Sequence, residues 1–167
     1  MSNLQYNTLT IAGMAIVPVG TDGKIDLHAG GTGGADVVGD VSGYFTTGTG
    51  GETYHAIGAT RMIDTRQNGA PVASGGTLTV AQGNTVVALN PTLVLNLTVV
   101  NGTSSGFLTV YPDGTSVPLA SNVNWGTGEV VANLAFAATG RGTADIHNGS
   151  VGTVQIVVDC LGYFAPG

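Results

Sequence analysis

The chain has 167 residues, of which 43 % are hydrophobic and only 8 % are charged. This balance excludes an intrinsically disordered protein, and the length is sufficient for one domain with its own core. Four basic residues stand against ten acidic ones, giving a formal charge of −6, and no segment gathers lysine or arginine. Neither nucleic acid nor an anionic membrane is therefore an expected partner.

The 28 glycines interrupt short apolar runs at close intervals, which is typical of an all-β protein with many turns. No window combines helical periodicity with capping residues. We expect an antiparallel β-sandwich, jelly-roll-like, formed by residues 50–167 and preceded by an N-terminal β-rich arm, residues 1–49. The Gly-rich stretch 46–51 predicts the linker between them.

Within the arm, the sequence predicts a long strand at residues 8–19, a turn at 20–23 and a return strand at 24–28. A glycine-rich connection at 30–34 leads to a third strand at 35–41, in which alternate residues are apolar. A phosphate-binding loop is a less favoured interpretation of those glycines, because no lysine or helix follows them.

The arm repeats the end of the chain. His28 and His147 are 119 residues apart, and the same spacing relates Asp40 to Asp159 and the Gly-Tyr-Phe sequence at 43–45 to that at 162–164. A weaker relative lies in the middle of the chain, where residues 96–100 and 106–111 match residues 133–137 and 142–147. Each unit is predicted to be a β-hairpin, two strands joined by a turn that contains glycine.

Between the copies, the pattern predicts strands at 77–80 and 85–89 around a turn at 82–84. The strongest predicted strand covers residues 93–100, with alternate apolar residues on one face, and residues 107–111 return from it.

Charges of both signs crowd together at one place, where Asp64 stands between Arg61 and Arg66. An aspartate between two arginines indicates a bidentate ion pair that holds an irregular segment in place. Ligand binding by the same three residues is the alternative.

The sequence predicts no catalytic, metal or cofactor site, and we do not expect an enzyme. Asp26 and His28, like Asp145 and His147, lie two apart on one strand face, but two ligands are too few for a metal. No serine lies in the turn that hydrolases use for a nucleophile. The single cysteine, Cys160, is expected to be a buried apolar thiol.

From Tyr54 to Phe164 the chain resembles a domain found repeatedly in exported proteins of actinobacteria and in some of their phages. The resemblance is carried by five segments, at residues 61–66, 95–101, 106–112, 120–125 and 157–164. It implies a surface module used for adhesion, display or scaffolding, and it implies no catalytic residues. The chain departs from a tandem array of such domains, because residues 8–45 match only the later part of the domain.

We therefore expect a structural protein of a surface or particle, such as a phage capsid decoration or tail component, on a virion or an extracellular surface. Its expected partners are further copies of itself, with a trimer favoured, and other coat or surface proteins, because exposed strand edges invite pairing. The residues after Met1 do not form a secretion leader. The alternative is a carbohydrate-binding module, in which Trp125 and Tyr111, if exposed, would stack on sugar rings.

Overall fold

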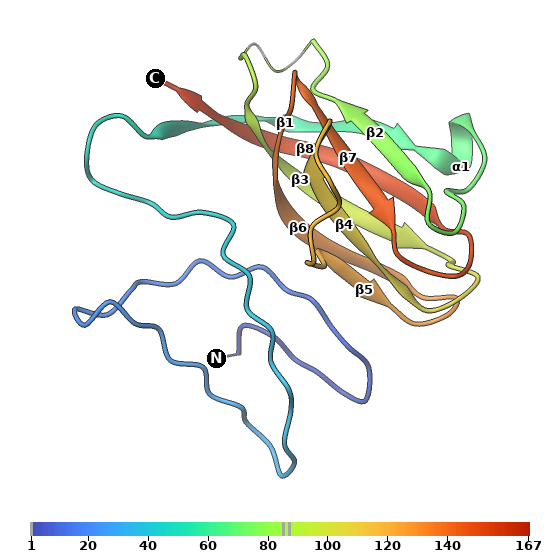
Figure 1. The fold of residues 1–167 in the computed structure, drawn as a ribbon, viewed down its shortest axis with the longest axis horizontal. Helices are drawn as coiled ribbons and strands as arrows, with labels where there is room; N and C mark the ends of the chain where they lie inside the picture. The colour runs from blue at the N-terminus through green and yellow to red at the C-terminus, as the bar shows by residue number, and fades with distance from the viewer. Residues whose placement is uncertain (1, 85, 87) are drawn as a thin grey trace.

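The computed structural model describes residues 2–84, 86 and 88–167. Within these described residues, eight strands and one short helix lie between Glu52 and Pro166 (Figure 1). In chain order they are β1 (Glu52–Asp64), α1 (Thr65–Asn68), β2 (Thr77–Ala81), β3 (Thr92–Val100), β4 (Gly106–Pro112), β5 (Val123–Trp125), β6 (Val130–Ala138), β7 (Thr143–Asn148) and β8 (Gln155–Pro166).

The strands form two four-stranded antiparallel sheets that pack face to face. The first sheet has the order β1-β8-β3-β6 and the second has the order β2-β7-β4-β5. This is the strand order of a jelly roll, a double sheet that contains two Greek keys. The predicted all-β sandwich is therefore confirmed.

The core lies between the sheets and is built by residues that alternate along each strand. On β3, Leu93, Leu95, Leu97 and Val99 are all fully buried, as the period-two pattern predicts. Burying one such side chain stabilises the fold by roughly 1.5–3 kcal/mol relative to leaving it exposed. All the residues of the core cluster come from position 72 or later, with partly buried neighbours from Ile57 onward. The sandwich thus has a complete core without the arm.

The predicted hairpins are wrong in one respect. Strands β3 and β4 belong to different sheets, and so do β6 and β7. Each pair is an arch that crosses from one sheet to the other, because both of its strands turn an apolar row toward the same core. The hydrogen-bonded partners are instead β3 with β6 and β4 with β7.

The match between the two arches is also shifted by one residue in its first strand. Asn133 lies opposite the fully buried Leu97 and so points inward, whereas Asn96 is the neighbour of Leu97 and points outward. A one-residue slip exchanges the two faces of a strand. The arches therefore correspond at a constant spacing of 36 residues, from Leu97 to Asn133 and from Val110 to Ile146.

The strand predicted at residues 85–89 is not observed in the part that the structure describes. Residues 85 and 87 lie outside the described residues, and Val86, Ala88 and Leu89 belong to no strand. The partner of β2 is β7, which lies more than 60 residues away.

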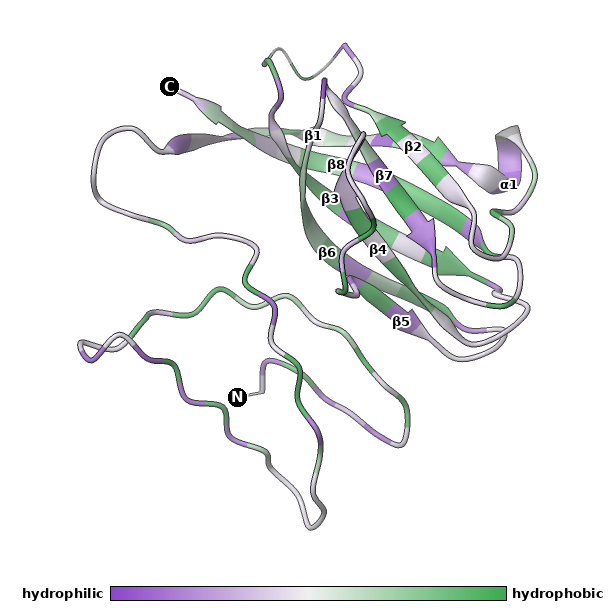
Figure 2. Cartoon of the chain, viewed as in Figure 1, coloured by the Kyte–Doolittle hydropathy of each residue, from purple (hydrophilic) through white to green (hydrophobic). Residues whose placement is uncertain are grey.

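The arm differs most from expectation. Residues 2–51, all of which are described, contain no strand, so the strands predicted at 8–19, 24–28 and 35–41 are not formed in the single chain. The arm loops away from the sandwich without regular secondary structure, although many of its residues are hydrophobic (Figures 1 and 2). A strand needs a neighbouring strand for its backbone hydrogen bonds, and this segment has none within its own chain.

Among the described residues, no helix is long and apolar enough to cross a membrane.

Candidate functional site

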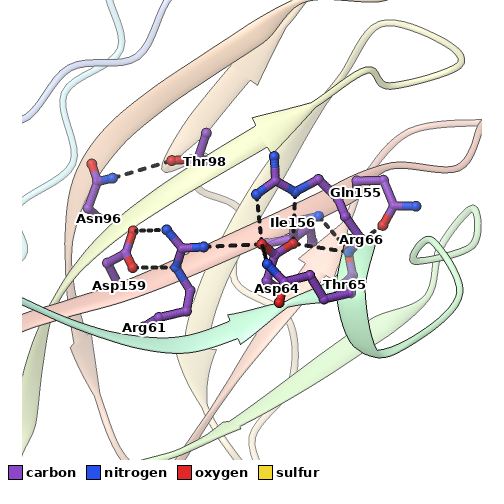
Figure 3. Close-up of polar contacts among 10 residues, drawn as sticks. Arg61, Asp64, Thr65, Arg66, Asn96, Thr98, Gln155, Ile156 and Asp159 are labelled. Carbon is purple, nitrogen blue, oxygen red and sulfur yellow. Dashed lines mark hydrogen bonds and ion pairs between the residues drawn. The ribbon is translucent and has the colours of Figure 1, made fainter.

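The charge cluster of Arg61, Asp64 and Arg66 forms as predicted, at the point where β1 passes into α1 (Figure 3). Arg66 donates from Nε and Nη2 to the two oxygens of Asp64, at 2.8 and 2.7 Å. Arg61 donates from Nη1 to the same carboxylate at 3.1 Å, and Asp64 caps the helix by accepting from the backbone N–H of Arg66. The two arginines thus fix one buried carboxylate.

The cluster also ties this corner to β8. Arg61 donates to both carboxylate oxygens of Asp159, and Thr65 accepts from the backbone N–H of Ile156 at 2.9 Å. The hydrogen bond from Arg66 is the largest cause that lowers the pKa of Asp64 from 3.8 to about 2, and the charges of both arginines add to it. Every charge here has a partner in the chain, which favours the structural interpretation over ligand binding.

The two rings predicted to stack on sugars are not exposed. Trp125 is only 4 % exposed and belongs to the core cluster, where its indole N–H donates to the carbonyl of Ser104 at 2.8 Å. Tyr111 is 7 % exposed. The condition for sugar stacking is therefore not met by either ring, because a ligand must be able to reach a face of the ring and both side chains are buried.

Other candidate chemistry in the sandwich is occupied or isolated. Asp145 accepts a hydrogen bond from Thr79 across the second sheet at 2.7 Å. Within the described part of the chain, no three His, Cys, Asp or Glu side chains gather closely enough to hold a metal ion. Cys160 is buried, as predicted, and its burial raises the pKa of the thiol.

The arm presents the largest set of exposed apolar side chains. Ile16, Ile25, Leu27, Val37 and Val41 are between 52 and 89 % exposed. At the spacing of 119 residues they correspond to positions that are at most 1 % exposed in the sandwich, namely Ala135, Ala144, Ile146, Ile156 and Cys160. The arm therefore has the inward face of β6, β7 and β8 without anything that covers it.

The glycines that the two copies share also indicate that the arm lacks covering side chains. In the sandwich, a Cβ atom at Gly149 would collide with the ring of Phe107, and one at Gly162 would collide with the ring of Tyr54. Their counterparts Gly30 and Gly43 have no described atom within 4 Å of that position. The arm thus keeps glycines at positions where the sandwich needs room for rings from its earlier strands.

A second apolar surface lies on the outside of the first sheet. Alternate residues of the edge strand β6 point outward and are all apolar: Val130, Ala132, Leu134, Phe136 and Ala138. Phe136 packs edge-on against Phe164 of β8, and Phe45 of the arm contacts the same ring, with centroids 5.9 Å apart. This surface is not among the sites predicted from the sequence. Apart from Asn133, β6 is an unbroken apolar run, and this run was the signal that could have revealed the surface, because such runs are typical of strands covered on both faces.

Comparisons with known protein families, with characterised proteins and with solved structures find no match to this chain.

Proposed function

We propose that the chain is a non-catalytic structural protein that assembles on a surface or particle through its N-terminal arm, residues 1–49. The observation that carries the proposal is the exposed apolar face of the arm, which repeats the buried face of β6, β7 and β8. Exposed apolar surface of this extent in a soluble chain marks an interaction site. A chain that supplies strands without their partners is suited to joining subunits.

Two further features support an assembly role. The outer face of β6 is apolar at the edge of its sheet, so the sandwich also offers a surface for packing. Jelly rolls occur in viral coat proteins as well as in lectins, and the sequence resemblance to actinobacterial and actinophage surface domains adds the expectation of a virion decoration or tail component. Fold alone does not decide between these roles. Glycan binding has less support, because the two rings that would carry it are buried.

The test is the mass in solution of the full chain and of a variant that begins at Gly50, measured by light scattering at micromolar concentration. The proposal predicts an oligomer for the full chain and a monomer for the shortened one, which retains the whole core cluster. A full chain that is monomeric and behaves like the shortened one would overturn the proposal.

A further inference from the structure

The sandwich shows how an arch of this type is paired. The β3–β4 arch lies against the β6–β7 arch, strand by strand and antiparallel in both sheets. Leu97 lies opposite Asn133 in the first sheet, and Val110 lies opposite Ile146 in the second. Both pairs join residues that correspond at the 36-residue spacing.

This pairing is unchanged when the two arches are exchanged. Leu95 lies opposite Ala135, and Val99 lies opposite Val131. At the 36-residue spacing, the counterpart of Leu95 is Val131 and the counterpart of Val99 is Ala135, so exchanging the arches turns the first pair into the second. An exchange of this kind defines an approximate two-fold axis, which passes through the Leu97–Asn133 pair and the Val110–Ile146 pair. The sandwich is thus held together by two related arches around one axis.

The arm contains a third arch of the same type that has no partner. Its two strand sequences, residues 11–19 and 24–29, correspond to β6 and β7 at the 119-residue spacing. The turn between them is already formed, with Gly23 at φ 78°, the same value as its counterpart Gly142. The two arches of the sandwich differ in sequence, so the two-fold axis relates them only approximately. The arm arches of two copies are identical, so a two-fold axis can relate them without any such difference. This is the relation that a symmetric interface requires.

We propose that the arms of two copies pair with each other around a two-fold axis through Met14 and Leu27, the counterparts of Asn133 and Ile146. This proposal rests on the assembly function above and names its partner, the arm of a second copy. In the first sheet of the pair, residues 11–19 of the two copies lie antiparallel, with Met14 opposite Met14. In the second sheet, residues 24–29 of the two copies lie antiparallel, with Leu27 opposite Leu27.

The rest of the arm fits this arrangement. In the sandwich, β8 pairs with β3, the strand of the other arch, and Leu95 lies opposite Cys160. By the same register, Val41 of one arm lies opposite Ala12 of its partner, and Val37 lies opposite Ile16. Three of these four side chains, Ile16, Val37 and Val41, are now 61 to 89 % exposed and would be covered in the pair. The result is a six-stranded sandwich with three strands from each arm.

The register also brings opposite polar groups together. In the second sheet, Asp145 lies opposite Tyr111, and His147 lies opposite Thr109. His147 is also the counterpart of Tyr111 at the 36-residue spacing. In the arm pair, Asp26 of one copy therefore lies opposite His28 of the other, on both sides of the Leu27 pair. The Asp-x-His sequence, which has too few ligands for a metal site, acquires a role in recognition between copies.

The experiment is cysteine crosslinking of the full chain. Directly opposite residues in antiparallel strands have Cα atoms about 4.5–5.5 Å apart, within the range that a disulfide spans. Leu27→Cys and Met14→Cys are each expected to give a disulfide-linked dimer with oxidised glutathione. Val38→Cys is the matched control, because Val38 is even more exposed than Leu27 in the single chain but lies opposite Ala15 in the pair. The unsubstituted chain controls for Cys160, which is buried.

A second variant pair tests the register without a crosslink. His28→Asp places two like charges opposite each other at two symmetric positions and is expected to weaken the dimer roughly 2- to 30-fold, as measured by sedimentation equilibrium. Adding Asp26→His to it exchanges the two residues and should restore the affinity.

The outcomes separate this inference from the proposed function. A trimer or larger ring that needs the arm, or a Val38→Cys chain that crosslinks as readily as Leu27→Cys, would overturn the two-fold pairing and leave an assembly role in place. A chain that stays monomeric with and without the arm overturns both.

Discussion

Residues 9–48 and residues 128–167 correspond along their whole length at one spacing, but they have opposite environments in the same molecule. The later copy forms β6, β7 and β8, with Ile146 and Ile156 fully buried. The earlier copy forms no strand, and the counterparts of those residues, Leu27 and Val37, are 71 and 61 % exposed.

The difference lies in the neighbours and not in the local sequence. In the sandwich, β8 lies between β1 and β3, and β7 lies between β2 and β4. The arm has no segment of its own that matches those four strands. Strand formation is therefore a property of the assembled sheets, and a β-pattern in a sequence indicates the capacity to pair more than the presence of a partner.

The largest difference in stability between the two copies of the repeat is expected when the same core side chain is shortened in each copy. Ile146→Ala should lower the free energy of unfolding of the sandwich by about 2–5 kcal/mol, because it leaves a cavity in a fully buried position. Leu27→Ala, at the corresponding arm position, should change it by less than ~0.5 kcal/mol. Chemical denaturation followed by the fluorescence of Trp125, the single tryptophan and a core residue, measures the sandwich alone. Equal losses in the two variants would contradict the comparison.

Matched glycine substitutions should give a smaller difference of the same sign. Gly162→Ala forces a methyl group against the ring of Tyr54 and should destabilise the sandwich by about 1–3 kcal/mol. Gly43→Ala meets no described atom within 4 Å and should leave unfolding of the single chain unchanged. The same denaturation curves measure both variants, and Tyr54→Ala in the background of Gly162→Ala tests whether the collision is the cause. If that second change recovers none of the loss, the cause lies elsewhere.

The sequence was sufficient for the sandwich, because period-two apolar rows such as Leu93 to Val99 specify both the strand and its buried face. It was not sufficient for pairing. A row of apolar residues shows which face is inward but not which sheet the strand joins, so the β3–β4 and β6–β7 arches were predicted as hairpins. The same limit applies to the arm, where residues 35–41 have a regular strand pattern and form no strand in the single chain.

In the candidate site too, contacts between residues close in sequence could be predicted and contacts between distant residues could not. The Arg61–Asp64–Arg66 cluster was predictable because its partners are close in sequence and their geometry is fixed by the guanidinium fork. The burial of Trp125 was not, since it depends on β5 closing the edge of the second sheet. The contact between Arg61 and Asp159 joins residues 98 positions apart and could not be found from local spacing.

The cluster exists only in the sandwich, and it predicts a dependence of stability on pH. The pKa of Asp64 is about 2 in the folded chain and 3.8 without its partners, so the stabilisation is complete above pH 3.8 and is lost as the pH falls through about 2. Asp64→Asn should lower stability at neutral pH and should flatten its decline between these two values. Thermal unfolding across this range measures the effect, with Asp40→Asn, in the exposed arm, as the control. A decline in Asp64→Asn as steep as in the unsubstituted chain would show that other carboxylates cause it.

The smallest predicted difference separates Asp159 from its counterpart Asp40. Asp159 accepts from Arg61, whose side chain is 47 % exposed, so Asp159→Asn should reduce stability slightly and less so at high salt. Asp40→Asn should have no effect on the sandwich at any salt concentration, because the arm contributes nothing to that core. Denaturation midpoints at roughly 0.01 and 1 M salt, where the Debye length falls from about 30 to about 3 Å, measure both. A salt-dependent loss in Asp40→Asn would mean that the arm carboxylate has found an arginine of its own, in the sandwich or in another copy, and that the two copies of the repeat are less different than their exposure indicates.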